Sequence, residues 1–241
     1  MHHNWQYFVL HCSLRYLATS TLLATENKTV KKIIVIIIVL LLLAAALAFV
    51  LREPLKQAAY DRLTADMFVS ADTDAFDPGP AIGSSFPGLR AIYQGREVNL
   101  LGEFAGSRGT VLIASRSLDW CPYCMKQMIE LQQYKQAYDD AGIGMVAITY
   151  DAPQLQQAFI DKFSIGIPVL SDIDALSFKT LGILNTQYQA GDRQYGIPYP
   201  GMIVINRQGI VVGKLFLEAY SSRVSATAAL EYTLQALGEE T

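Results

Sequence analysis

Two cysteines separated by two residues carry the clearest chemistry in the sequence. Cys121-Pro122-Tyr123-Cys124 stands at the predicted start of a helix, so both sulfurs fall on one side of its first turn, within reach of a disulfide. Unpaired N–H groups and the helix dipole stabilise a thiolate at that end of a helix and lower the pKa of a thiol there. We therefore predict Cys121 as the nucleophile and Cys124 as the resolving thiol of a redox-active disulfide.

The same spacing leaves two plainer roles open, a structural disulfide or half of a zinc site. Zinc would need two more ligands, and the remaining cysteine, Cys12, lies near the N-terminus with His2, His3 and His11, the only histidines in the chain. Without imidazole in the globular part, Ser-His-Asp hydrolases, Cys-His proteases and His-ligated metal enzymes are excluded. We expect chemistry at sulfur, with no metal and no cofactor.

The elements that must position the dithiol alternate between strands and helices. The apolar run Thr110–Ser115 predicts a buried strand before the dithiol, and the helix that starts at Pro122 continues to about Asp140. The other predicted elements are a hairpin at Ala91–Leu100, a strand at Met145–Thr149, helices at Pro153–Phe163, Asp174–Leu181 and Ser222–Leu237, and a hairpin of Met202–Asn206 with Ile210–Phe216. This order predicts an α/β fold, with a mixed sheet flanked by helices, in one domain over residues 86–241.

One long apolar segment precedes this domain. No polar side chain occurs from Ile33 to Leu51, which is long enough for one transmembrane helix. A signal peptide is the alternative, but its apolar region would be shorter, and no small-residue cleavage site follows here. Residues 52–85 are expected to form a juxtamembrane helix, over Glu53–Phe68, and then a linker rich in Asp, Pro, Gly and Ser.

Charge predicts the orientation of this anchor. Residues 1–32 are net positive and the rest of the chain is net negative, so residues 1–32 are expected in the cytoplasm and the C-terminal domain outside it, in the periplasm. If translation starts at Val30, most of residues 1–32 are untranslated. The soluble part has no block of Lys or Arg, which excludes nucleic acid as a partner.

The dithiol and its surroundings resemble the thioredoxin superfamily, and within it the peroxiredoxin-like AhpC/TSA, or redoxin, domains. The resemblance covers about Ile82–Leu237 and rests on Trp-Cys-Pro-Tyr-Cys together with the Tyr-Pro-Gly before the final hairpin. It implies a thioredoxin-like fold and a cis peptide bond before Pro200, which would present the Tyr199 backbone to a substrate disulfide. The substrate-binding residues that it implies are Trp120, Pro122, Tyr123, Tyr199 and Pro200.

One part of the resemblance conflicts with the dithiol. Peroxiredoxins carry a Pro-x-x-x-Thr/Ser-x-x-Cys signature and a distant Arg, and the hydroxyl and the Arg position the peroxide. On this chain the reacting cysteine falls on Cys124, the Thr on Cys121 and the Pro on Ser117. No Arg stands beside Pro200, and Arg116, at the predicted end of a strand, is expected to be a solvated side chain.

The resemblance and the dithiol together predict a membrane-anchored thiol-disulfide oxidoreductase, whose partners are disulfides and thiols of proteins or small molecules. The close alternative is a thiol-dependent peroxidase, a peroxiredoxin-like antioxidant that acts on peroxides. A further alternative is a non-catalytic, membrane-tethered binding module in which Cys121 and Cys124 form a structural disulfide.

Overall fold

A computed structural model describes residues 4–71, 75–99 and 101–238, with side chains from residue 28 onward. The chain forms two units, Met1–Ala59 and Tyr60–Thr241. No side chains are described for the segment that contains His2, His3, His11 and Cys12. The predictions about these four residues therefore fall outside the described part of the chain.

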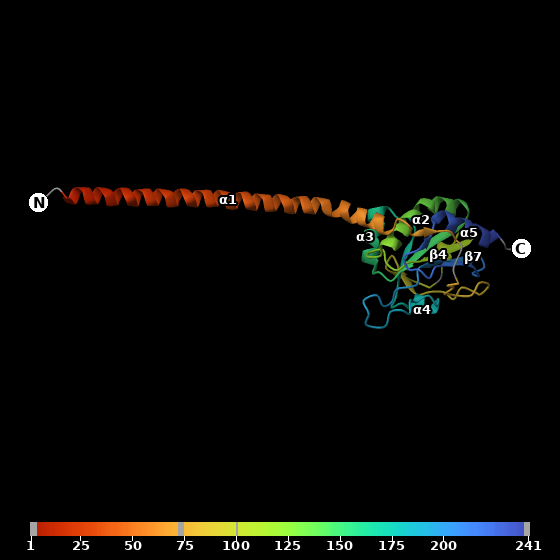
Figure 1. The fold of residues 1–241 in the computed structure, drawn as a ribbon. Coiled ribbons are helices and arrows are strands. Elements are labelled where there is room, and N and C mark those ends of the chain that lie inside the picture. Colours follow the sequence, from red (N-terminus) through yellow and green to blue (C-terminus); the bar gives the residue numbers. More distant parts are fainter. Residues whose placement is uncertain (1–3, 72–74, 100, 239–241) are drawn as a thin grey trace. The chain divides into compact units, whose positions relative to one another are not determined.

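Helix α1, Asn4–Leu63, makes up the described part of the first unit and contains the predicted anchor Ile33–Leu51 without a break (Figure 1). From Lys28 to Leu63 it is long and apolar enough to cross a bilayer. Its large apolar side chains, such as Leu42 and Phe49, are exposed rather than packed into a core.

The second unit begins at Tyr60, earlier than the boundary predicted near residue 86. Helix α1 was expected to reach Phe68 but ends at Leu63, and both the N–H and the Oγ1 of Thr64 donate to the Tyr60 carbonyl, at 2.9 and 2.7 Å. Phe68–Val69 instead form strand β1, which pairs in parallel with β9, Arg223–Val224. Backbone pairing with a distant segment therefore overrides the local helical pattern.

The predicted linker also contributes to the second unit. The Gly83 N–H donates to the Val211 carbonyl at 2.7 Å, and the Phe86 N–H donates to the Gly209 carbonyl at 2.8 Å. The nearly buried ammonium of Lys214 lies 2.8 Å from the Asp77 carboxylate. These contacts attach residues before Phe86 to the final hairpin.

Seven strands of the second unit form one mixed sheet, in the order β3-β2-β6-β5-β4-β7-β8. The central strands β6, β5 and β4 are parallel, while β2 joins β6, and β7 joins β4, in antiparallel fashion. The strands are β2 Ala91–Tyr93, β3 Arg96–Val98, β4 Gly109–Ala114, β5 Ile143–Thr149, β6 Val169–Asp172, β7 Gly201–Asn206 and β8 Val211–Phe216.

Alternating side chains of the central strands build a core on each face of this sheet. On β4, Val111 and Ile113 belong to the core that includes residues of α2 (Pro122–Asp140) and α5 (Ala226–Gly238), whereas Leu112 and Ala114 belong to the other core. Figure 1 shows α2 and α5 together on one face of the sheet and α4 on the opposite face. The predicted mixed sheet flanked by helices is confirmed.

Two predicted helices are shorter in the structure, although α2 and α3 (Pro153–Phe163) have the expected bounds. Helix α4 covers only Leu176–Thr180, because Asp174 and Ala175 adopt positive φ angles of 51° and 58°, which a right-handed helix cannot contain. Helix α5 was expected from Ser222 but begins at Ala226, because the preceding residues form β9.

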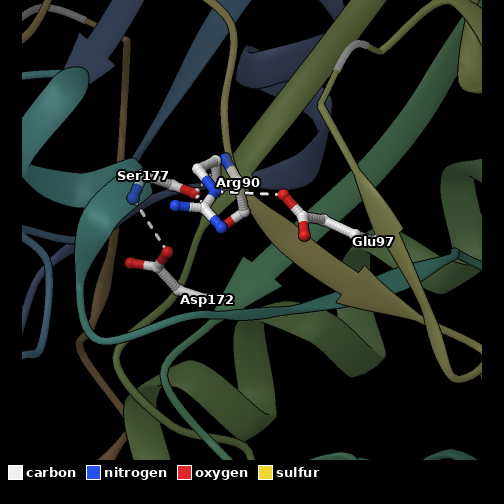
Figure 2. A network of polar contacts seen from close by, with 4 residues as sticks. All are labelled: Arg90, Glu97, Asp172 and Ser177. Carbon is white, nitrogen blue, oxygen red and sulfur yellow. Dashed lines mark hydrogen bonds and ion pairs between the residues drawn. The ribbon is translucent and has the colours of Figure 1, made fainter.

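A polar network attaches α4 and the β2–β3 hairpin to the end of β6 (Figure 2). Asp172 accepts hydrogen bonds from the N–H groups of Ser177, at 2.9 Å, and Phe178, at 3.3 Å. The Ser177 hydroxyl donates to the Arg90 carbonyl at 2.7 Å, and the Arg90 side chain donates to Glu97 at 3.0 Å. The carboxylate thus satisfies donors at the start of a helix too short to form alone.

Candidate functional site

The dithiol lies where the sequence predicts it, between the end of β4 and the first turn of α2. Cys121 is the N-cap residue of α2, Pro122 occupies the first helical position, and Cys124 follows inside the first turn. Both cysteines are free thiols and both are buried, with 1% of each residue exposed. The site is therefore a reduced pair enclosed by protein.

A buried carboxylate shapes the loop before the dithiol. Asp151, just after β5, accepts hydrogen bonds from the Ser117 hydroxyl and the Leu118 N–H, both at 2.7 Å. The Ser117 oxygen in turn accepts the N–H groups of Asp119, at 3.0 Å, and Trp120, at 3.2 Å. Burial raises the pKa of Asp151, and these donors oppose that rise. Ser117, which replaces the Pro of the peroxiredoxin signature, thus organises the turn that leads into Cys121.

Sequence reasoning missed Arg223, which lies against the dithiol. Its Nη2 donates to the Cys124 sulfur at 3.3 Å, and only 2% of the residue is exposed. Its Nη1 donates to the carbonyls of Tyr220, at 2.8 Å, and Ser222, at 2.6 Å. The Arg223 backbone is held by β1, because its N–H donates to the Met67 carbonyl at 2.8 Å. In sequence Arg223 falls within a predicted amphipathic helix, where an Arg is ordinarily solvated, so no local signal distinguishes it.

The two thiols of the reduced pair differ in acidity. Burial alone would raise the pKa of Cys124, but the hydrogen bond with Cys121, the Arg223 charge and the Ser117 backbone lower it well below the usual thiol value. Ser115, whose buried hydroxyl has no other partner among the described residues, acts in the same direction. The pKa of Cys121 is raised by its hydrogen bond to Cys124 and by burial. These directions are opposite to those expected from the position of Cys121 at the helix N-terminus, and the role of Cys121 as the nucleophile stays a prediction.

The aromatic residues next to the dithiol in the sequence contact further aromatic side chains. Trp120, just before Cys121, is 37% exposed, and its indole N–H donates to the Tyr150 hydroxyl at 2.9 Å. The ring of Tyr123 meets the ring of Tyr220 edge-on, with centroids 6.0 Å apart. Tyr220 is 61% exposed. Two of the predicted substrate-binding residues, Trp120 and Tyr123, thus lie among aromatic neighbours that local sequence patterns did not single out.

Arg116 is not the solvated side chain that the sequence suggested. Only 7% of this residue is exposed, because its guanidinium lies over the rings of Trp120, at 5.3 Å, and Tyr220, at 5.4 Å. These are distances from which a cation attracts an aromatic face.

The expected cis bond before Pro200 is not found, since all described peptide bonds are trans. The trans form is the favoured one for an X-Pro bond, and the Tyr199 N–H is already used by the Ile183 carbonyl, at 2.7 Å. Pro200 lines a very small cavity together with Arg223 and Gln127, while the Tyr199 ring packs edge-on against Phe76. Pro200 thus lies beside the arginine of the site, and Tyr199 has partners elsewhere.

The AhpC/TSA family model matches residues 82–214, more than half of the chain. The chain belongs to the AhpC/TSA family. Its membership identifies it as an oxidoreductase of the thioredoxin superfamily. The matched residues contain the dithiol of this AhpC/TSA domain and end before Arg223.

Known proteins agree with this assignment. Bcp of Haemophilus influenzae, a protein named as a peroxiredoxin, is 24% identical over 132 residues, which are 55% of this chain and 83% of bcp. The structure of peroxidoxin BcpB from Mycobacterium tuberculosis matches with a TM-score of 0.54 at 18% identity, over 66% of this chain and 97% of BcpB. A peroxiredoxin-like protein from Aquifex aeolicus matches with a TM-score of 0.56 at 18% identity, over 66% of this chain and 90% of its own. These structures support the fold of the domain.

Replacing Arg223 with Met should raise the pKa of Cys124 toward the ordinary thiol value of about 8.5, because burial is then no longer opposed by a nearby positive charge. The ultraviolet absorbance of the thiolate, followed against pH, measures this shift. Because the Cys124 pKa is depressed in the folded state, the stability it contributes is present above the unfolded pKa and is lost as pH falls through the folded one. Arg207→Met, in the exposed turn after β7, is the control and should leave the pKa unchanged.

Strand β1 should act through the same contact, because it holds the Arg223 backbone. Val69→Pro, which interrupts strand pairing, should raise the Cys124 pKa in the otherwise native chain and have no further effect when Arg223 is already Met. Val69→Thr keeps the backbone N–H and is the matched control. Equal shifts in both backgrounds would show that β1 influences the thiols by a route other than Arg223.

Proposed function

We propose that the protein is a membrane-anchored thiol-disulfide oxidoreductase of the AhpC/TSA type, in which Cys121 and Cys124 alternate between dithiol and disulfide. The observation that carries this proposal is the placement of two buried free thiols at the N-cap and in the first turn of α2. A second thiol thus stands where a peroxidase of this family would present a hydroxyl. An intramolecular disulfide can form from such a pair.

The reaction with a substrate disulfide proceeds in two exchanges. The Cys121 proton moves to the Cys124 thiolate, and the Cys121 sulfur attacks the substrate S–S bond, so that a mixed disulfide forms and the first substrate sulfur leaves as a thiolate. That thiolate takes the proton from Cys124, whose sulfur then attacks Cys121 and releases the second substrate sulfur. The substrate gains two electrons, and the Cys121–Cys124 disulfide holds the oxidising equivalents until a thiol reductant returns it to the dithiol.

Arg223 supports a second candidate, a thiol-dependent peroxidase. With its thiolate stabilised by Arg223, Cys124 could attack a peroxide oxygen, become a sulfenic acid and release an alcohol or water; condensation with Cys121 would then release water and form the same disulfide. Such a reaction also needs donors aimed at the leaving oxygen. The Thr position of the peroxidase signature is Cys121, and a thiol is a weak hydrogen-bond donor. This candidate is therefore placed second.

The purified full-length chain should reduce a disulfide faster than it consumes hydrogen peroxide, because a missing donor for a developing oxyanion typically costs a factor of about 10² to 10³ in rate. Both rates are measured for the native chain, Cys121→Ser and Cys124→Ser. Cys121→Ser should abolish disulfide reduction, and Cys124→Ser should trap a mixed disulfide on Cys121. The peroxidase would be established instead by two results together. The native chain would consume peroxide faster than it reduces a disulfide, and peroxide consumption would survive in Cys121→Ser and disappear in Cys124→Ser. A disulfide that resists glutathione, with neither activity, would point to the non-catalytic binding module.

The apolar helix supports a single-pass anchor with the redox domain outside the cytoplasm. Residues 1–32 carry the net positive charge that favours the cytoplasmic side, and disulfides persist in extracytoplasmic compartments. An alkaline phosphatase fused after Thr241 should be active in bacterial cells, and the same reporter fused after Lys32 should not. Activity of the Lys32 fusion alone would reverse the proposed orientation.

A further inference from the structure

Arg116 is a buried cation without a counter-ion in the described part of the chain. Its residue exposure is 7%, and its Nε is buried with no hydrogen-bond partner. No carboxylate of the described residues forms an ion pair with it; Asp119, three residues away, is exposed, and Asp151 accepts the Ser117, Leu118 and Thr149 donors. A charge this deeply buried is ordinarily paired.

The other buried guanidinium of the site, that of Arg223, also has an Nε without a hydrogen-bond partner among the described residues, but both of its Nη atoms have partners. Arg223 contacts the Cys124 sulfur, which provides a negative charge, and two backbone carbonyls. In the described part of the chain, the contacts of the Arg116 guanidinium are with the faces of Trp120 and Tyr220. Aromatic faces attract a cation without neutralising it, so the site still lacks one negative charge.

The position of Arg116 ties it to the dithiol. Trp120 immediately precedes Cys121, and the Tyr220 carbonyl accepts the hydrogen bond from Arg223. The Tyr220 ring also contacts the ring of Tyr123, which stands between the two cysteines. Both rings that hold Arg116 are partly exposed, and one of them belongs to the residue directly before Cys121.

We propose that Arg116, with Trp120 and Tyr220, forms a subsite for the carboxylate of an anionic thiol or disulfide substrate. A carboxylate matches the planar fork of a guanidinium, and the two rings lie within cation–π distance of that fork. This proposal deepens the proposed function by naming the substrate class of the same dithiol. It concerns binding, so Arg116 is a specificity residue rather than a catalytic one.

Alkylation of the dithiol by iodoacetate and by iodoacetamide tests the subsite without any turnover, because the two reagents differ mainly in charge. On the full-length chain, Arg116→Met should lower the ratio of the iodoacetate rate to the iodoacetamide rate roughly tenfold, the size expected for loss of one charged hydrogen bond. Arg207→Met, which removes an equal charge from the exposed turn after β7, should leave the ratio unchanged. An unchanged ratio in Arg116→Met would overturn the proposal.

A measurement on the native chain covers the case in which Arg116→Met does not fold. Propionate, which carries a carboxylate but cannot alkylate, should slow the iodoacetate reaction at constant ionic strength, whereas propionamide should not. Equal effects of the two compounds would also contradict the subsite.

Substrate charge then separates this proposal from the proposed function. Three disulfides of similar size are compared: dithiodipropionate has two negative charges, hydroxyethyl disulfide has none, and cystamine has two positive charges. Their kcat/KM values should fall in that order. Arg116→Met should remove most of the difference. If none is reduced, the oxidoreductase proposal fails, and the alkylation ratio still decides for or against the subsite.

Discussion

The Arg223 guanidinium donates to the Cys124 sulfur inside the protein, and each group makes the burial of the other tolerable. An isolated thiolate or an isolated guanidinium in such surroundings would be strongly destabilised by the loss of water. The fold brings the two together from distant parts of the chain. Cys124 comes from the first turn of α2, and Arg223 comes from β9, which pairs with the strand that directly follows α1. The segment next to the apolar helix is therefore part of the support of the redox site.

This contact also determines how the two sulfurs share their chemistry. The two thiols titrate as a pair, in which the pKa of Cys124 is lowered and that of Cys121 is raised, so the charge of the singly ionised pair is expected on Cys124. A stabilised thiolate favours the reduced state, so Arg223 is expected to make the Cys121–Cys124 disulfide more oxidising, by about 30 mV for each 1.4 kcal/mol of stabilisation. The same arginine would assist attack on a disulfide or on a peroxide. Cys121 in place of a hydroxyl favours disulfide exchange over peroxide reduction, because a thiol is a weak hydrogen-bond donor to a leaving oxygen.

Local patterns in the sequence were sufficient for the elements that carry the dithiol. The apolar run Thr110–Ser115 and the Pro122 N-terminus located β4 and α2, and Pro153–Phe163 was predicted with the bounds of α3. Local patterns failed where long-range pairing decides the structure. Phe68 and Arg223 both lie in segments with helical patterns, and only their pairing with each other makes them strands. Arg223 could not be recognised as a site residue for that reason, and Arg116 could not be seen as buried without the rings that cover it.

The central claim is that the ionised sulfur of the reduced site is Cys124. Titration of thiolate absorbance in the full-length Cys121→Ser and Cys124→Ser variants, each with Cys12 also replaced by Ser, tests it most directly. Each variant then retains one thiol, and the serine hydroxyl can still donate a hydrogen bond. An ordinary thiol has a pKa of about 8.5. In Cys121→Ser the remaining thiol should ionise well below that pH, whereas the remaining thiol of Cys124→Ser should not. A low-pKa thiolate that persists in Cys124→Ser and is lost in Cys121→Ser would contradict the account.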